Sequence, residues 1–287
     1  MAHFPDWMDP EEVRIVLSLY DFTGEAVRPW AEAGYECHIY DIKHPEVPER
    51  IDVGKRGGSI TKHRADLHNP FTIDLLAGQW GEAGVVFLSA FPVCTDLAVS
   101  GARHFAQKEE EYPGFQLRAA GRAMWCADLA EHLGCPYYIE NPVSRLSTLW
   151  RKPDYTFNPC DFGGYIPIGQ HEHPRWPEVI PPRDAYTKRT CLWTGGGFVM
   201  PVPSFVDPVR VRYQKADGSW TVGSPQFGKL GGKSQRTKDI RSATPRGFAR
   251  AVYLDNGMEG TTRADYDGLG DAINRKQEEL GLEEATE

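Results

Sequence analysis

The chain has 287 residues, of which 40% are hydrophobic and 25% charged, a balance typical of globular domains and not of disordered or fibrous chains. No run of about 18 apolar residues occurs, so the sequence predicts no membrane-spanning helix. The net charge of −8 disfavours a protein that binds nucleic acid over its whole surface, although a local basic face remains compatible with it.

Six cysteines are scattered along the chain and form no compact framework. In a chain of this length, that pattern predicts reduced thiols in an intracellular protein. The first dozen residues are acidic and contain no apolar signal core, so no export is expected. Cys160, His171, His173 and Cys191 are spaced unlike any closed zinc-binding pattern, so no metal is predicted.

The first half of the chain alternates between strand-like and helix-like segments. Apolar, β-branched runs predict strands at 13–20, 35–42, 84–90 and 136–141. Helical spacing of apolar residues predicts helices at 26–34, 71–79 and 116–134. Strands that alternate with helices indicate a doubly wound parallel sheet, so we expect an α/β, Rossmann-like catalytic and cofactor-binding core over residues 1–150.

The amino-acid composition changes at residue 151. Residues 151–187 are rich in Pro, Gly and His, while 189–195 predicts a core strand and 209–223 a hairpin. We therefore assign 151–240 to a partly irregular segment that contributes one core strand, and a family resemblance carried by the motifs of the chain implies that it also holds a small target-recognition region. A helix that returns to the core is expected within 241–260, and an acidic helix or tail within 261–287.

Residues 226–250 form a basic segment. Seven cations stand against Asp239 alone, and seven minus one gives +6 in an otherwise acidic chain. Blocks of like charge are often interaction segments, so this glycine-containing stretch predicts a flexible loop that contacts phosphates, with a merely solvated loop as the alternative. The residues expected to contact nucleic acid are Lys229, Lys233, Arg236, Lys238 and Arg241.

The first strand and the end of the second carry the residues of a nucleotide-binding unit. In such units the turn after strand one approaches the ligand closely, and an acid after strand two binds the ribose hydroxyls. Asp41 follows Gly24 by 17 positions, near the usual spacing of about 20. Only one glycine stands where a dinucleotide site has three, so a cofactor with a single ribose fits better than NAD.

Cys94 stands two positions after Pro92, in a loop that follows the strand predicted at 84–90. Buried cysteines are common, so one interpretation is a packed core residue. The other is a nucleophile held in place by a tight loop, because the thiolate is the reactive form of cysteine.

Five segments, in this order, resemble the cytosine-C5 DNA methyltransferase family, especially its compact phage and prophage members. They are YDFTGEAVRPWAEAGYECHIYDI, FPVCTDLAVSG, YIENPVSRL, YTKRTCLWTGG and RSATPRGFARA. The corresponding family motifs are F-x-G-x-G with a following acid, P-P-C, E-N-V, Q-x-R-x-R and G-N-x-V-P. The resemblance covers roughly residues 13–255. It implies an S-adenosylmethionine-dependent enzyme that acts on DNA in the cytoplasm of a bacterium or a phage-infected host cell.

The resemblance also implies roles for single residues. Cys94 would attack C6 of a cytosine that has been flipped out of the duplex, which makes C5 able to take up a methyl group. Glu140 would protonate base N3, and Arg189 would hold base O2. Asp41 would bind the cofactor ribose and Asp66 the adenine amino group. The full set implied for the cofactor is Phe22, Gly24, Asp41, Ile42, Asp66, Pro92 and Ser242.

The chain departs from the family pattern at several positions. P-P-C is P-V-C here, E-N-V is E-N-P, the second glycine of F-x-G-x-G is Ala26, and the Q-x-R-x-R strand keeps only its last arginine. Arg241 opens the segment that aligns with G-N-x-V-P, which in the family lies beside the methionine end of the cofactor. An arginine there is compatible with carboxy-S-adenosylmethionine and carboxymethyl transfer, while contact with a phosphate is the alternative.

Two further interpretations stay open. The enzyme could modify cytosine in RNA or in a free nucleotide, or the chain could be a non-catalytic relative that binds DNA. Only 46 residues separate Thr194 from Arg241, so short or relaxed sequence recognition is expected.

Overall fold

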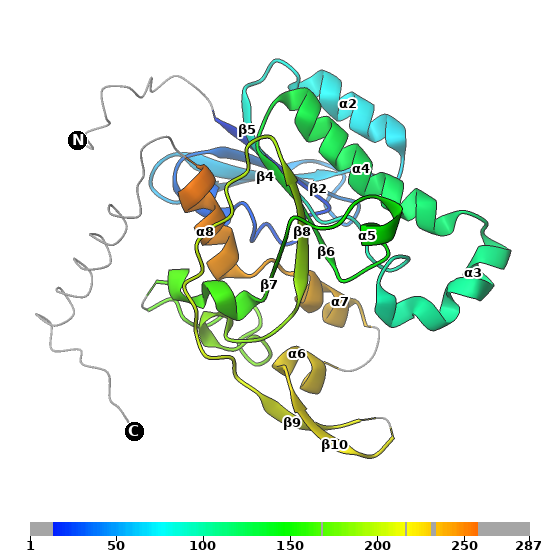
Figure 1. Ribbon diagram of the computed structural model, residues 1–287. Coiled ribbons are helices and arrows are strands. Elements are labelled where there is room, and N and C mark those ends of the chain that lie inside the picture. The colour runs from blue at the N-terminus through cyan, green and yellow to red at the C-terminus, as the bar shows by residue number, and fades with distance from the viewer. Residues whose placement is uncertain (1–13, 168, 216, 231–233, 258–287) are drawn as a thin grey trace, which may run out of the picture.

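Figure 1 shows the computed structural model, which describes residues 14–167, 169–215, 217–230 and 234–257. An eight-stranded sheet forms its centre, in the order β3-β4-β2-β1-β5-β6-β8-β7. These strands are β1 Ile15–Leu19, β2 Glu36–Asp41, β3 Glu49–Val53, β4 Gly58–Arg64, β5 Val85–Ala90, β6 Tyr137–Pro142, β7 Tyr155–Phe157 and β8 Thr190–Gly195. A separate antiparallel ribbon pairs β9, Val211–Gln214, with β10, Trp220–Gly223.

The sheet is mostly parallel, which makes it compatible with the predicted Rossmann-like class. Strands β4, β2, β1, β5 and β6 pair in parallel, whereas β3 and β8 are antiparallel to their neighbours. The chain passes from β1 to β2 on one side and later to β5 on the other. The strand order therefore reverses between β1 and β5, and ligands of open α/β sheets bind at the carboxyl ends of strands at such a point.

Helices cover both faces of the sheet (Figure 1). They are α1 Arg28–Glu32, α2 Pro70–Trp80, α3 Phe105–Glu111, α4 Phe115–Leu133, α5 Leu146–Leu149, α6 Pro225–Gly228, α7 Gln235–Ser242 and α8 Arg246–Asn256. One apolar cluster joins α2 and α4 to the sheet, and a second joins α1 and α8 to its other face. No helix among the described residues has the length and apolar content required to cross a bilayer.

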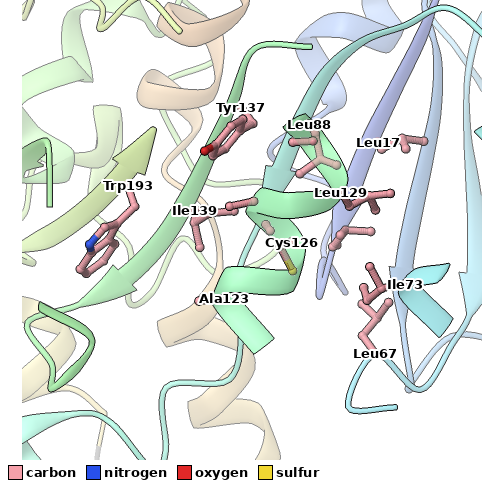
Figure 2. Close-up of a cluster of buried hydrophobic side chains, with 14 of the residues drawn as sticks. Leu17, Leu67, Ile73, Leu88, Ala123, Cys126, Leu129, Tyr137, Ile139 and Trp193 are labelled. Atoms are coloured by element: carbon pink, nitrogen blue, oxygen red, sulfur yellow. The ribbon is translucent and has the colours of Figure 1, made fainter. Parts of the chain in front are cut away.

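Helix α4 shows how sequence positions one face of the core. Its alanines at 119, 120, 123, 127 and 130 are buried, and side chains this small let the helix lie close to the strands. Figure 2 shows Ala123, Cys126 and Leu129 of α4 beside Leu88 and Ile139 of the sheet. The helix ends at Gly134, whose φ of +68° is the left-handed conformation of a helix C-cap.

The structure corrects the predicted elements in two places. Strands β3 and β4 form a hairpin over 49–64, where no strand was predicted, because β3 is an exposed edge strand with a charged sequence. The flexible loop predicted within 226–250 is wrong for 225–228 and 235–242, which are the helices α6 and α7. Residues 231–233, and therefore Lys233, lie outside the described residues, as do 258–287 with the predicted acidic tail.

Helix α7 forms because of its cap and its buried positions. The Ser234 hydroxyl oxygen accepts a hydrogen bond from the Thr237 amide at 3.1 Å, which caps the helix N-terminus. Thr237 and Ile240 lie one turn apart and are buried. Ile240 belongs to a third apolar cluster, with Val179, Ile180, Tyr186 and Leu230, which fastens α7 to the irregular segment.

Candidate active site

The turn after β1 is held by a buried carboxylate. Asp21 is 3% exposed and accepts hydrogen bonds from the Gly24 amide (2.7 Å), the Thr23 amide (3.0 Å) and the Ser18 hydroxyl (2.9 Å). Gly24 has a φ of +70°, and a Cβ there would also meet the Ile39 side chain at 3.4 Å. Sequence reasoning found Gly24 but missed Asp21, although an Asp three residues before a Gly is a recognisable turn signal.

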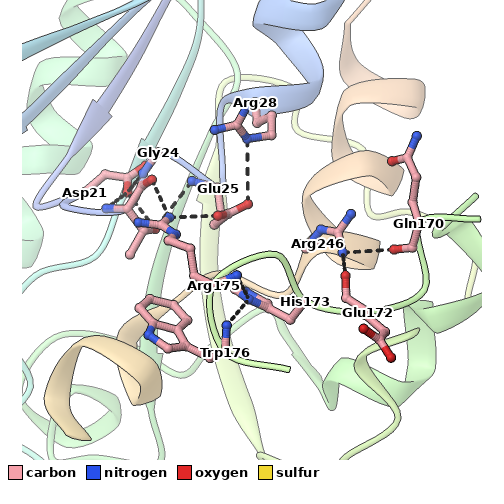
Figure 3. A network of polar contacts seen from close by, with 11 residues as sticks. Asp21, Gly24, Glu25, Arg28, Gln170, Glu172, His173, Arg175, Trp176 and Arg246 are labelled. Carbon is pink, nitrogen blue, oxygen red and sulfur yellow. Dashed lines mark hydrogen bonds and ion pairs between the residues drawn. The ribbon is translucent and has the colours of Figure 1, made fainter. Parts of the chain in front are cut away.

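A second carboxylate ties this turn to the irregular segment. Glu25 is 2% exposed, and its Oε1 lies 2.7 Å from the Arg175 guanidinium, which also donates to the Thr23 carbonyl at 2.8 Å. Figure 3 shows this pair together with Arg246, which donates to the carbonyls of Gln170 and Glu172. The stretch 170–176 is thus fastened between the first turn and α8.

Phe22 and Asp41 are both predicted to bind the cofactor. Contacts made by Lys43 and His44 link the two residues. The His44 ring stacks on Phe22 with 5.8 Å between centroids, and the Lys43 ammonium lies 3.8 Å from the Phe22 centroid. The Lys43 amide donates to Asp41 at 2.8 Å. Lys43 also forms an ion pair with Asp239 of α7 at 2.9 Å, so Lys43 links the basic helix to the Phe22 ring.

Asp66 and Ile42 follow β4 and β2 at the same edge of the sheet, and both are exposed to solvent. Asp66 is exposed after β4, and its carboxylate accepts from the His68 amide at 3.0 Å. Ile42 is 53% exposed. An aromatic ring, one carboxylate after β2 and another after β4 lie at the carboxyl edge of the sheet, where carboxylates can accept hydrogen bonds from the hydroxyl and amino groups of a nucleoside with one ribose.

The Cys94 loop is fixed by main-chain hydrogen bonds and by the side chain of Asn141, the residue after Glu140. The Asn141 side chain, which is buried, donates to the Pro92 carbonyl at 2.9 Å. The Cys94 carbonyl accepts from the amides of Leu97 (2.9 Å) and Ala98 (2.8 Å). Cys94 is the one cysteine of the six that is not fully buried, so its thiol is half-buried in a held loop.

A small pocket lies beside this loop. Glu140 at the end of β6 and Lys188 just before β8 face it with Phe91, and the remaining lining comes from Phe157, Phe248 and the stretch 242–245. Ser242, predicted to bind the cofactor, is part of that stretch. The pocket therefore gathers the ends of β5, β6 and β8 and the link between α7 and α8.

Burial shifts the pKa values of Glu140 and Cys94 in the same direction. Burial raises the pKa of Glu140, and the Lys188 ammonium opposes this rise. Burial also raises the pKa of the Cys94 thiol, the Glu140 carboxylate adds to the rise, and Lys188 opposes it. A carboxyl group with a raised pKa can donate a proton near neutral pH, as a general acid must.

The structure does not place Arg189 in this pocket. Lys188 and Arg189 both precede β8, which begins at Thr190, and of the two Lys188 lines the pocket. Leu192 pairs directly with Glu140, and Arg189 is exposed. The prediction that Arg189 holds the base is therefore not supported, and Lys188, which the sequence reasoning missed, occupies the pocket instead.

The basic segment makes bonds within the protein as well as facing solvent. Lys229 donates to the Glu178 carbonyl at 2.9 Å, and Arg236 pairs with the Glu178 carboxylate. Arg241 donates to the Leu230 carbonyl at 2.9 Å. Lys238 is exposed. Arg241 thus points toward Leu230, and its side chain is not among the groups that line the pocket, so nothing here favours an extra carboxylate at Arg241.

Metal-binding groups do not assemble in the part of the chain that the structure describes. No group of three or more His, Cys, Asp and Glu side chains there is arranged to hold an ion.

Comparison with known proteins adds no relative from which a role could be transferred. No protein-family model matches the chain, and no curated protein matches it significantly.

Proposed function

We propose that the chain transfers a methyl group from S-adenosylmethionine to C5 of cytosine in DNA. The observation that carries this proposal is that Glu140 and Lys188 line one pocket and both act electrostatically on the nearby Cys94 thiol, next to the strand edge that carries Phe22 and Asp41. A half-buried thiol, a buried acid and a cation are the groups that activation of C5 requires.

The Cys94 thiolate makes C5 reactive. After losing its proton to solvent, the thiolate forms a bond to C6 while Glu140 gives its proton to N3. The resulting enamine has an electron pair at C5, which would form the new bond to the methyl carbon while the sulfonium sulfur of the cofactor would keep the pair of the broken S–CH3 bond and leave as a neutral thioether. Loss of the C5 proton to water, return of the N3 proton to Glu140 and cleavage of the S–C6 bond restore the aromatic ring and the thiolate.

The protein's own residues arrange these events. Asn141 anchors the Pro92 carbonyl and so fixes the approach of Cys94. Phe91, Phe157 and Phe248 form apolar walls of the pocket beside Glu140, and burial raises the pKa of its carboxyl group. S-adenosylmethionine, when bound, supplies an electrophilic methyl group, and Phe22, Asp41 and Asp66 are the residues that would hold its adenosine.

Mass spectrometry of nucleosides tests the proposal. DNA from cells that express the protein should contain a modified cytosine heavier by a methyl group, and Cys94→Ala should abolish it. Cys135→Ala is the matched control, because Cys135 is buried after α4, away from the pocket. Each variant's unfolding temperature shows that it is folded.

Other outcomes would redirect the assignment. A cytosine heavier by a carboxymethyl group would point to the carboxylated cofactor. Modified cytosine in RNA or in the nucleotide pool, with unmodified DNA, would overturn DNA as the substrate. No modified base in any of these, with folded protein, would favour a non-catalytic binding protein.

A further inference from the structure

The pocket beside Glu140 is closed in this structure. Its cavity volume of about 10 Å³ is enough for roughly one water molecule and far too small for a pyrimidine ring. A base that has left the duplex can therefore reach Glu140 only after one wall of the pocket has moved away.

One wall of the pocket is held differently from the others. Phe157 and Phe248 belong to the apolar cluster on one face of the sheet, and their rings stack with 4.2 Å between centroids. The stretch 242–245 instead continues from α7, whose buried Ile240 belongs to the small third cluster. This wall can therefore move without opening the main core.

Two lysines tie α7 to the residues beside the sheet. The Lys43 ammonium, after β2, lies 2.9 Å from the Asp239 carboxylate of α7. The Lys188 ammonium, before β8, donates to the Arg241 carbonyl in the last turn of α7 at 2.8 Å. The lysine side chains are 33% and 21% exposed, and partly exposed ionic contacts of this kind are weak enough to be exchanged for others.

Lys43 also covers the aromatic ring that the proposed cofactor would use. Its ammonium lies 3.8 Å from the centre of the Phe22 ring, and the His44 ring stacks on Phe22 as well. His44 is buried, and its Nε2 lies 3.0 Å from the Asp21 carbonyl oxygen. A purine that stacks on Phe22 would therefore displace the more exposed Lys43 and leave His44 in place.

We propose that α7 and the stretch 242–245 form a lid that the ion pair of Lys43 with Asp239 holds shut, and that binding of S-adenosylmethionine at Phe22 releases it. The inference rests on the proposed function and assigns its regulation, because the cofactor must bind before the pocket admits a base. Lys43 and Asp239 are positioning residues in this scheme.

Competition for Phe22 is what couples the two sites. A ligand shifts an equilibrium between two states only if it binds one of them better. With the lid shut, Lys43 occupies the Phe22 ring, and with the lid open the ring is free. A nucleoside therefore binds the open state better and increases its population.

Amide hydrogen exchange tests the lid without any ligand. Asp239→Asn removes the charge that holds Lys43, so amides in 241–245 should exchange about threefold faster, as for the loss of one partly exposed ion pair. Lys43→Met removes the other partner, which lies outside α7, and should give the same rise. Exchange that stays at the wild-type rate in both variants would overturn the lid.

Glu49→Gln is the matched control for Asp239→Asn. It removes the carboxylate from a similar ion pair, in which the Lys62 ammonium lies 3.0 Å from Glu49 on the β3–β4 hairpin. Exchange in 241–245 should then be as in wild type. A rise there in Glu49→Gln as large as in Asp239→Asn would show a general loosening of the protein and would overturn the lid.

Titration calorimetry with S-adenosylmethionine tests the release. A change that increases the population of the binding-competent state strengthens binding by the same factor. Asp239→Asn should therefore bind the cofactor about threefold more tightly than wild type, although Asp239 is not among the residues that would hold the adenosine. Unchanged or weaker binding would show that Lys43 does not compete with the cofactor.

The cofactor should also change exchange in wild type in opposite directions at two places. Bound S-adenosylmethionine should slow exchange at 21–25, which it covers, and speed exchange at 241–245, where the lid is released. Slower exchange at both places would mean that the cofactor closes the lid, and would overturn the inference.

The two proposals fail separately. If wild type modifies DNA but Asp239→Asn matches it in exchange and in cofactor affinity, the lid fails and the proposed function stands. If wild type does not bind S-adenosylmethionine, the proposed function fails, and the release of the lid by the cofactor fails with it.

Discussion

Asp21 is the residue on which the first turn depends. Its carboxylate accepts hydrogen bonds from two main-chain amides and two hydroxyl groups. Asp21→Ala would leave these donors buried without an acceptor, at a cost of about 3 kcal/mol in unfolding free energy. Asp21→Asn keeps one acceptor oxygen and should cost less.

Urea unfolding monitored by circular dichroism measures both variants. Asp74→Asn, an exposed carboxylate on α2, is the matched control and should change the unfolding free energy by less than about 0.5 kcal/mol. Equal stability of Asp21→Ala and wild type would show that the turn does not need its internal acceptor.

Single residues also show how much of the candidate site can be predicted from the sequence. Cys94 and Glu140 were predicted from the segments around them, and the structure brings the two close enough to interact electrostatically. The choice between Lys188 and Arg189 required the structure, because both precede β8 in a stretch without regular secondary structure. Arg175 could not be predicted as the partner of Glu25, since it comes from an irregular segment 150 positions later.

Elements with strong local signals were predicted well. Helix α4 has buried alanines at helical spacing and a glycine cap, and β6 is a buried run before a polar end, so both were placed within about two residues. Helix α7 was not predicted because its sequence is mostly charged and polar, and its two buried residues give too weak a helical pattern. Its apolar partners, such as Ile180 and Tyr186, belong to a segment without periodicity.

Under the proposed function, the ribbon of β9 and β10 is the element that we expect to contact duplex DNA. Trp220 and Val222 are each 58% exposed, and they pair with Gln214 and Arg212, so all four side chains share one face. The Arg212 guanidinium lies 4.8 Å from the centre of the Trp220 ring, which orients its donors. A two-stranded ribbon fits the major groove, where an arginine commonly contacts guanine.

Trp220→Ala should therefore weaken binding of duplex DNA by about tenfold, through the loss of stacking and of the oriented arginine. Fluorescence anisotropy at fixed salt measures the change. Phe71→Ala, an exposed aromatic on α2, should bind like wild type. Unchanged affinity in Trp220→Ala would remove the ribbon from the DNA-binding surface.

Stability of the whole molecule should depend on pH through Asp184. This residue is fully enclosed, and its carboxylate accepts from the Gly247 amide at 2.9 Å in the first turn of α8. Burial raises the pKa of Asp184 from 3.8 to about 6. Because the folded protein holds this proton more tightly than the unfolded chain, the stabilisation is complete below pH 3.8 and is lost as the pH rises through about 6.

Asp184→Asn should make the unfolding temperature less dependent on pH between pH 4 and 7. The shift of about two pKa units corresponds to roughly 3 kcal/mol for this one group. Scanning calorimetry across that range compares wild type, Asp184→Asn and the exposed control Asp74→Asn. Parallel curves for all three would show that Asp184 does not govern the pH dependence.

The ion pair between Glu25 and Arg175 can form only late during synthesis of the chain. Their separation of 150 positions corresponds to roughly 8–30 s of translation. Until Arg175 has left the ribosome, the ion-pair partner that the nascent chain holds for Glu25 is Arg28, at 3.9 Å. The bond between the first turn and the stretch 170–176 therefore forms late, after β1, β2 and β4 have been made.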